Sequence, residues 1–224
     1  MNLCVIPARG GSKRFKNKNR KIFFGKPIIS YTIESAIKSK CFDKILVTSD
    51  DQKILKIAEK YNISCEKRKN ELSSDTASVS DVLTDIIKRM KPKPHIISCL
   101  FPTAPLRDHN DIKKVFNNVC KQNYNFSLAV TKYTLPPHQA LMIDKKNLAK
   151  PMWPSIVYKK ESEIPELVVD NGSTYSAKVS EFLKTGHFFG SSLKVHVMDI
   201  KYSVDLNTKE DFDLLRYYYK RNIK

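Results

Sequence analysis

The stretch Leu3–Asn19, LCVIPARGGSKRFKNKN, decides the fold. Its first four residues form an apolar run that is typical of a buried strand, and a basic loop with two adjacent glycines follows directly. Gly10 and Gly11 allow a sharp turn that brings backbone N–H groups close to an anion, while Arg9 and Lys18 supply positive charge. Neither the dinucleotide-binding fingerprint nor the Walker sequence is present. The stretch therefore predicts a strand followed by a phosphate-binding loop of another kind.

Apolar runs that are typical of strands alternate with helical patterns over the following residues. Strands are expected at residues 3–6, 44–49, 96–100 and 126–130. Apolar residues at three- and four-residue spacing predict helices at residues 29–39, 51–61, 79–90 and 111–122. This alternation predicts an α/β, doubly wound fold with a mainly parallel sheet and helices on both faces. In such folds ligands bind beyond the carboxyl ends of the strands, which is where the basic loop lies.

Residues at the helix ends support this layout. Pro27 can occupy the first turn of its helix, where a missing N–H costs nothing. Thr76 or Ser78 can cap the helix that begins near residue 79. Thr208, with Asp211 three residues later, resembles a capping box that opens a last helix.

Residues 133–168 interrupt the regular pattern. Prolines stand at positions 136, 137, 151, 154 and 165, a density that breaks regular helices and central strands. No internal repeat or low-complexity linker occurs in the chain. We therefore expect one domain over residues 1–224, with residues 133–168 as a small excursion from the main sheet.

Composition is that of a globular protein rather than a membrane or disulfide-stabilised one. The chain has 224 residues, of which 41% are hydrophobic and 28% charged. No apolar run approaches the roughly 20 residues of a membrane helix, and residues 1–6 are too short for a signal peptide, so a cytoplasmic protein is expected. The five cysteines are widely spaced and mostly apolar in context, which favours reduced core residues over disulfides or zinc ligands.

The formal net charge of +17 raises the question of nucleic-acid binding. The basic residues are scattered through expected helices as well as loops, and no arginine-rich tail, zinc finger or aromatic-basic strand motif accompanies them. We therefore expect no nucleic-acid partner.

Several motifs in register resemble one family. The loop at residues 6–19 is similar to the signature loop of the acylneuraminate cytidylyltransferases, which activate sialic acid and its relatives with CTP. The further motifs FFGKPIISYTIESA, LVTSDD, ELSSDTAS, PTAPLR, NGSTY, FF and VDLNTKEDF follow in the order of that family. The resemblance implies a Rossmann-like nucleotide-sugar transferase fold, Mg²⁺ as cofactor, and a homodimer to which residues 133–168 contribute.

The resemblance also implies a nucleotide site. Positions that match its triphosphate-binding and catalytic residues are Arg9 and Lys18, with Gly10, Gly11, Ser12, Lys13 and Asn19 of the same loop. Arg68 falls where the family places an arginine that contacts cytosine, although Lys69 replaces the usual proline after it. Ser78 or Ser80 would provide an assisting hydroxyl, and helix capping is the alternative role of Ser78.

A magnesium site is implied by the motif VDLNTKEDF. Family members commonly present two aspartates separated by one residue, and this chain has Asp205 and Asn207 there. An asparagine carbonyl can ligate Mg²⁺ directly or through water but adds no charge. The alternative is that Asp205 merely ties the turn before the last helix.

The sugar-binding residues that the resemblance implies are Phe101, Gln139, Asn171, Tyr175, Phe188 and Phe189. Tyr and Phe side chains can form an apolar wall beneath an N-acyl group. Phe188 and Phe189 are otherwise typical of a hydrophobic core. Phe101 replaces a glutamine, and Gln139 a basic residue, of the members that act on sialic acid.

These departures favour a deoxygenated sugar over ordinary N-acetylneuraminate. The motifs PPHQALMID and KPMWP resemble the pseudaminic acid enzymes, and legionaminic acid is equally deoxygenated. The resemblance therefore implies transfer of a cytidylyl group from CTP to a nine-carbon acidic sugar. Two alternatives stay open: a synthetase for the eight-carbon acid of lipopolysaccharide, and a nucleotide-sugar-binding protein of the same fold that lacks catalysis.

Overall fold

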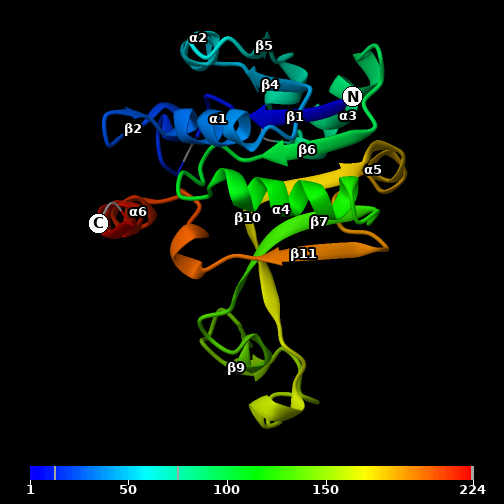
Figure 1. Cartoon of the computed structure of the whole chain (residues 1–224). Coiled ribbons are helices and arrows are strands. Elements are labelled where there is room, and N and C mark those ends of the chain that lie inside the picture. The colour runs from blue at the N-terminus through cyan, green and yellow to red at the C-terminus, as the bar shows by residue number, and fades with distance from the viewer. Residues whose placement is uncertain (13, 75, 223–224) are drawn as a thin grey trace.

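The computed structural model describes residues 1–12, 14–74 and 76–222 of the chain. Within these residues the centre is a seven-stranded sheet with the order β11-β7-β10-β6-β1-β4-β5 (Figure 1). Its strands are β1 (Asn2–Pro7), β4 (Lys44–Ser49), β5 (Ser64–Lys67), β6 (Ile96–Leu100), β7 (Phe126–Lys132), β10 (Val168–Lys178) and β11 (Leu193–Val197). All neighbouring strands pair in parallel except β10, which is antiparallel to β6 and β7.

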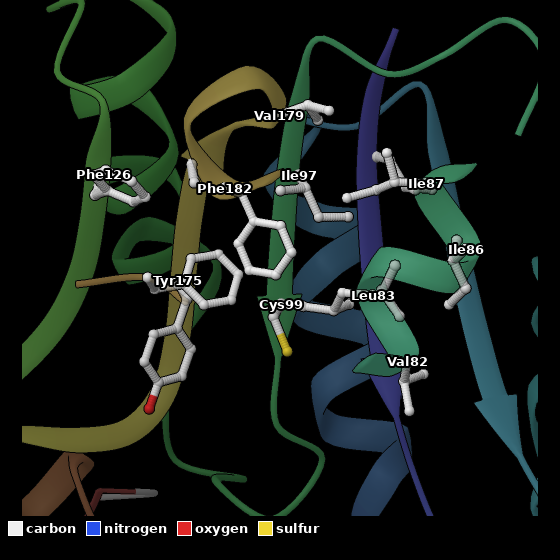
Figure 2. Packing of buried hydrophobic residues seen from close by; sticks show 14 of the residues in the cluster. Val82, Leu83, Ile86, Ile87, Ile97, Cys99, Phe126, Tyr175, Val179 and Phe182 are labelled. Carbon is white, nitrogen blue, oxygen red and sulfur yellow. The ribbon is translucent and has the colours of Figure 1, made fainter. Parts of the chain in front are cut away.

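Helices cover both faces of the sheet. Successive side chains of a strand point to opposite faces, and in the central strands both sets of side chains are apolar. Leu3 and Val5 pack with α3 and α5, while Cys4 and Ile6 pack with α1, α2 and α4. The helices are α1 (Ile28–Ser39), α2 (Gln52–Glu59), α3 (Val79–Arg89), α4 (His109–Cys120), α5 (Val179–Thr185) and α6 (Lys209–Asn222). Figure 2 shows the packing on the face covered by α3 and α5, where Phe182 of α5 lies close to Cys99 of β6.

The expected strands and helices are confirmed, with small shifts at their ends, and so is the α/β fold class. Ser78, rather than Thr76, caps α3: its side chain accepts from the backbone N–H of Asp81 at 3.1 Å. The capping box before α6 is also present, since Asp211 Oδ2 accepts from the N–H of Thr208 at 2.8 Å. None of the described helices is both long and apolar enough to span a membrane.

An aromatic cluster fixes α6 to the N-terminal part of the chain. Phe15 lies 5.7 Å from Phe212, and Phe23 lies 5.1 Å from Tyr219, between ring centroids. The short elements of this region are the 3₁₀ turn η1 (Lys18–Arg20) and the strands β2 (Ile22–Phe23) and β3 (Lys26–Pro27). Elsewhere in the chain lie the 3₁₀ turns η2 (Glu71–Ser73), η4 (Glu161–Glu163) and η5 (Ile200–Tyr202). The segment that follows the basic loop is therefore packed against the last helix.

The proline-rich segment leaves the sheet between β7 and β10 and extends away from the body of the molecule (Figure 1). It contains η3 (Pro137–Gln139) and a small antiparallel pair, β8 (Leu141–Ile143) with β9 (Ala149–Pro151). Many of its large apolar side chains are exposed: Tyr133, Leu135, Leu141, Met142, Ile143, Leu148, Met152, Trp153, Tyr158 and Leu167. We refer to residues 133–167 as the arm.

A buried arginine joins helix α1 to strand β10 of the sheet. Arg107, which follows β6, is 1% exposed. Its Nη1 donates to the carbonyl oxygen of Ser173 in β10 at 2.7 Å, and its Nη2 donates to Thr32 Oγ1 in α1 at 2.8 Å. Burial lowers the pKa of Arg107 to about 10, and no carboxylate forms an ion pair with it among the described residues. Its hydrogen bonds to neutral oxygens therefore offset the cost of burying the cation.

Replacing this arginine is expected to destabilise the fold. Arg107→Ala removes the bonds to α1 and β10, leaves buried oxygens unsatisfied and creates a cavity, so the free energy of unfolding in urea should fall by about 3 kcal/mol. Arg89→Ala is the matched control, because Arg89 makes partly exposed ion pairs with Glu66 and Asp85 and should cost less than about 1 kcal/mol. Equal losses for the two variants contradict the assigned role of Arg107.

Candidate active site

A cleft of about 300 Å³ lies at the carboxyl ends of β1 and its neighbours. Arg9 follows β1, Arg68 follows β5 and Phe101 follows β6, so parallel strands deliver all three side chains to one edge of the sheet. Six residues expected at the site line this cleft together: Arg9, Lys18, Asn19, Arg68, Ser78 and Phe101. The apolar side chains of α3 close its other side.

The glycine loop passes close to the end of β4. A Cβ atom on Gly10 would stand 2.9 Å from Cβ of Asp51, so this approach requires glycine. The Gly10 N–H donates to Asp50 Oδ1 at 2.7 Å, so this amide already has an acceptor. Ser12 Oγ is buried and has no hydrogen-bond partner among the described residues, as expected of a group that awaits a ligand or water. Lys13, also expected at this site, lies outside the described residues; Gly11 is exposed, and a Cβ there would meet no atom within 4 Å.

Asn19 and Lys18 occupy the turn η1 at the rim of the cleft. Asn19 is 3% exposed, and its Nδ2 donates to the carbonyl oxygen of Arg9 at 2.8 Å, which holds the start of the loop. Its Oδ1 has no partner among the described residues. Burial lowers the pKa of Lys18, and the charge of Asp205 opposes this shift.

Arg68 is almost completely buried beside the carboxyl end of β4. Its Nη2 donates to the carbonyl oxygen of Thr48 at 2.8 Å, whereas its Nε has no partner among the described residues. Burial lowers the pKa of this guanidinium, and the carboxylate of Asp50 opposes the shift. An arginine fixed in this way at a cleft wall can donate to a polar ring edge. Ser78 lines the same cleft, but its hydroxyl already caps α3.

The turn before α6 folds onto the basic loop. Asp205 accepts from the hydroxyl of Thr103, which lines the cleft, and from Asn207 Nδ2 at 2.7 Å. Lys18 Nζ donates to Asn207 Oδ1 and to the carbonyl oxygen of Leu206, both at 3.2 Å. Asp205 and Asn207 therefore bond to residues that line the cleft, although neither lines it itself. The bond between their side chains is the tie within the turn that was the alternative role of Asp205.

Aromatic residues extend from the cleft into the core. Phe101 meets Tyr175 edge-on, with 5.7 Å between ring centroids, and Tyr175 lies 5.2 Å from Phe188. Phe188 is 7% exposed and belongs to the hydrophobic core, the alternative role that the sequence left open. The Tyr175 hydroxyl donates to the carboxylate of Asp170 at 2.8–2.9 Å. Burial, followed by this carboxylate, raises the pKa of Tyr175.

Of the six expected sugar-site residues, only Phe101 lines this cleft: Tyr175 and Phe188 pack behind it, and the other three lie elsewhere. Asn171 is buried and already bonded, donating to Ser203 Oγ at 3.2 Å and accepting from the Ser173 hydroxyl at 2.7 Å. Phe189 is 51% exposed, and Gln139 lies exposed on the arm. Their roles stay predictions.

Four polar residues that sequence reasoning did not assign take part in the site or support it: Arg14, Asp50, Thr103 and Asp170. Asp50 stands directly after a predicted strand, where parallel sheets place functional groups, so its position was a usable signal. Thr103 and Asp170 lie within or beside motifs that were recognised, PTAPLR and NGSTY. Arg14 gives no such signal, because its partner, Asn207, lies at the other end of the chain.

A mainly parallel sheet with a basic glycine loop after its first strand and a cation-lined cleft at the carboxyl edge defines a nucleotide-binding α/β protein. The chain belongs to the cytidylyltransferase family, whose model matches residues 3–220. It is therefore a CTP-dependent nucleotidyltransferase by family.

Curated relatives span nearly the whole chain. The pseudaminic acid cytidylyltransferase of Campylobacter jejuni is 32% identical over 226 residues, which cover 99% of this chain and 97% of that protein. CMP-N,N'-diacetyllegionaminic acid synthase of Legionella pneumophila is 30% identical, covering 95% of this chain and 93% of that protein. N-acylneuraminate cytidylyltransferase of Escherichia coli is also 30% identical over 95% of this chain, which matches 50% of that longer protein.

A solved structure supports the fold. CMP:2-keto-3-deoxy-manno-octonic acid synthetase complexed with CTP has a TM-score of 0.75 to this chain and covers 99% of it, with all of that chain matched. The two sequences share 15% identity, so this likeness concerns the fold alone. It agrees with the Rossmann-like nucleotide-sugar transferase architecture expected from the sequence.

Proposed function

We propose that this protein transfers the cytidylyl group of CTP to a nine-carbon 2-keto acidic sugar, giving the CMP-sugar and pyrophosphate. The observation that carries the proposal is the meeting of Arg9, Lys18 and Arg68 in one cleft at the carboxyl edge of the sheet. The relatives support the sugar class, since those that cover 95% or more of this chain include pseudaminic, legionaminic and N-acylneuraminate enzymes.

The reaction demands charge neutralisation more than covalent help from the protein. A sugar hydroxyl attacks the α-phosphorus of CTP and loses its proton to solvent. The bond from the α-phosphorus to the oxygen that bridges to the β-phosphate breaks, and negative charge develops on the departing pyrophosphate. Arg9 and Lys18, which both line the cleft, would neutralise that charge. Arg68, which follows β5 at the same edge of the sheet, would hold the cytosine, and its unpaired Nε is an available donor.

The protein side chains alone offer too few ligands for Mg²⁺, so the phosphates of the substrate would have to supply the others. Asp205 offers a carboxylate at the cleft, but the described residues hold no cluster of three or more acidic, histidine or cysteine ligands. Mg²⁺ commonly uses one or two carboxylates plus substrate phosphates, and Asp205 with Asn207 meets that requirement. When bound there, the ion would supply positive charge against the charge of the triphosphate. Asn207 Oδ1 accepts hydrogen bonds from Arg14 and Lys18, and these bonds must break before the oxygen can bind Mg²⁺.

The sugar preference rests on the aromatic side of the cleft. Phe101 presents an apolar ring at the cleft wall, backed by Tyr175, and offers no hydrogen bond to a sugar hydroxyl. A site without that polar group suits a deoxygenated sugar. Among the proposed substrates we therefore favour pseudaminic acid, in keeping with the relative from Campylobacter jejuni, over N-acetylneuraminate. The eight-carbon acid stays the alternative, supported by fold likeness alone.

The role of Arg9 has a direct test. Arg9→Ala is expected to lower kcat for pyrophosphate release by about 10²–10³, the usual effect of losing one charge-stabilising donor. Lys16→Ala is the matched control, because Lys16 is an exposed cation of the same loop that does not line the cleft, and it should leave kcat nearly unchanged. A loss below about fivefold in Arg9→Ala argues against the assignment.

Position 207 tests the magnesium proposal. Asn207→Asp adds a second carboxylate two residues from Asp205, and one unit-charge contact at 4 Å contributes about 1 kcal/mol even in water. The magnesium concentration that gives half-maximal rate should therefore fall about fivefold or more. The measurement is a magnesium titration at saturating CTP with both proteins. An unchanged half-saturation removes position 207 from the metal shell.

We further propose that the arm forms a homodimer interface. Its exposed apolar side chains need a partner surface, and such patches on soluble proteins mark interaction sites. Gln139, which does not line the cleft of its own chain, would then serve the sugar site of the partner copy.

Light scattering at micromolar concentration tests this proposal. Wild type should show twice the mass of one chain, and Leu141→Glu combined with Ile143→Glu should give monomers by placing charge in the interface. Ile22→Glu is the control, because Ile22 is as exposed as Leu141, at 58% against 59%, but lies outside the arm. A monomeric wild type overturns the proposal.

A further inference from the structure

A second loop cation shares an acceptor with Lys18. Arg14 Nη2 donates to Asn207 Oδ1 at 3.0 Å, and Lys18 Nζ donates to the same oxygen at 3.2 Å. The two residues stand four apart in the basic loop, yet both reach a turn near the other end of the chain. Arg9 and Arg14 both act electrostatically on Lys18, so positive charge is concentrated at this point.

The shared acceptor is not a carboxylate, and the nearby charges of Asp205 and Asp211 act on Lys18 without an ion pair among the described residues. Asn207 is neutral, and its Nδ2 donates to Asp205 at 2.7 Å, so the amide separates the carboxylate from the two cations. Asp205 itself accepts from Thr103 and Asn207. A guanidinium bonded to a carboxylate would have to break an ion pair before it could bind another anion, whereas one bonded to an amide oxygen gives up much less.

The position of Arg14 is fixed by its neighbour. Phe15 packs on Phe212 of α6 at 5.7 Å, and Lys21 lies over both rings at 5.7–5.9 Å. The turn that holds Asn207 leads directly into the same helix. The loop and its acceptor are therefore anchored to one element, and Arg14, although exposed, is held beside Lys18 rather than pointing freely into solvent.

We propose that Arg14 is a third cation of the triphosphate site. When CTP binds, its guanidinium exchanges the Asn207 oxygen for oxygens of the two phosphates that leave as pyrophosphate, and its planar fork is suited to bidentate phosphate contacts. Asn207 is then a positioning residue that holds Arg14 and Lys18 in place while the site is empty. This inference rests on the proposed function and names one more residue of the same site.

Binding of CTP, pyrophosphate and CMP, measured by calorimetry at constant magnesium, tests the proposal. Arg14→Gln should weaken CTP and pyrophosphate about tenfold and leave CMP within about twofold, because CMP lacks the phosphates that Arg14 contacts. Lys16→Gln removes one charge from an exposed position in the same loop and should change none of the three affinities by more than about twofold. Arg14→Lys retains the charge without the fork and should recover part of the loss.

Two further measurements separate this role from a structural one. In the Asn207→Ala background, the effect of Arg14→Gln on pyrophosphate affinity should shrink, since the guanidinium is no longer held in place. Pyrophosphate affinity within twofold of wild type in Arg14→Gln, or equal weakening of CMP and CTP, overturns the proposal. The proposed reaction is contradicted if the wild-type protein binds CTP but releases no pyrophosphate with any acidic sugar. In that case the comparison of CTP and CMP affinities still decides the role of Arg14.

Discussion

The common direction of four adjacent strands is the constraint on which the rest of the structure depends. β5, β4, β1 and β6 run parallel, so the residues after each strand meet at one edge. This arrangement brings Arg68, Asp50, Arg9 and Phe101 together although they are spread over about a hundred residues of sequence. Gly10 allows the basic loop to pass close to the end of β4, because a residue with a Cβ atom would collide with Asp51 there.

The cleft is completed by segments from the far end of the chain. The turn at residues 205–207 lies on the basic loop through Asn207 and Lys18, and α6 fixes this contact through its packing on Phe15. On the other side, Arg107 ties α1 to β10, and β10 carries Tyr175, which backs the Phe101 wall. Nucleotide-facing and sugar-facing groups are therefore held by different contacts, which fits a site that orients two substrates for one displacement.

Much of the sheet could be predicted because its central strands are short apolar runs between amphipathic helices. β10 could not, since its sequence VVDNGSTYSAK is largely polar and it pairs antiparallel with two buried neighbours. Its register shifts between Asp170 and Tyr175, at the glycine turn of the NGSTY motif, where Gly172 has a φ of 67°. Periodicity does not reveal such a bulge.

The cationic side of the site could be predicted from the loop at residues 6–19, because its charges and glycines are contiguous in sequence. The pairing of Arg14 with Asn207 could not, since it depends on how α6 packs. Tertiary packing also decides that Phe188 is core while Phe189 is half exposed, although the two are adjacent.

The central claim is cytidylyl transfer from CTP to a nonulosonic acid in the cleft at the carboxyl edge. The most direct measurement is pyrophosphate release from CTP with magnesium, comparing pseudaminic, legionaminic and N-acetylneuraminic acids, with UTP and no-sugar reactions as controls. The account predicts release that requires CTP and a nonulosonic acid and is fastest with pseudaminic acid. Folded protein that releases no pyrophosphate with any of the three sugars contradicts it.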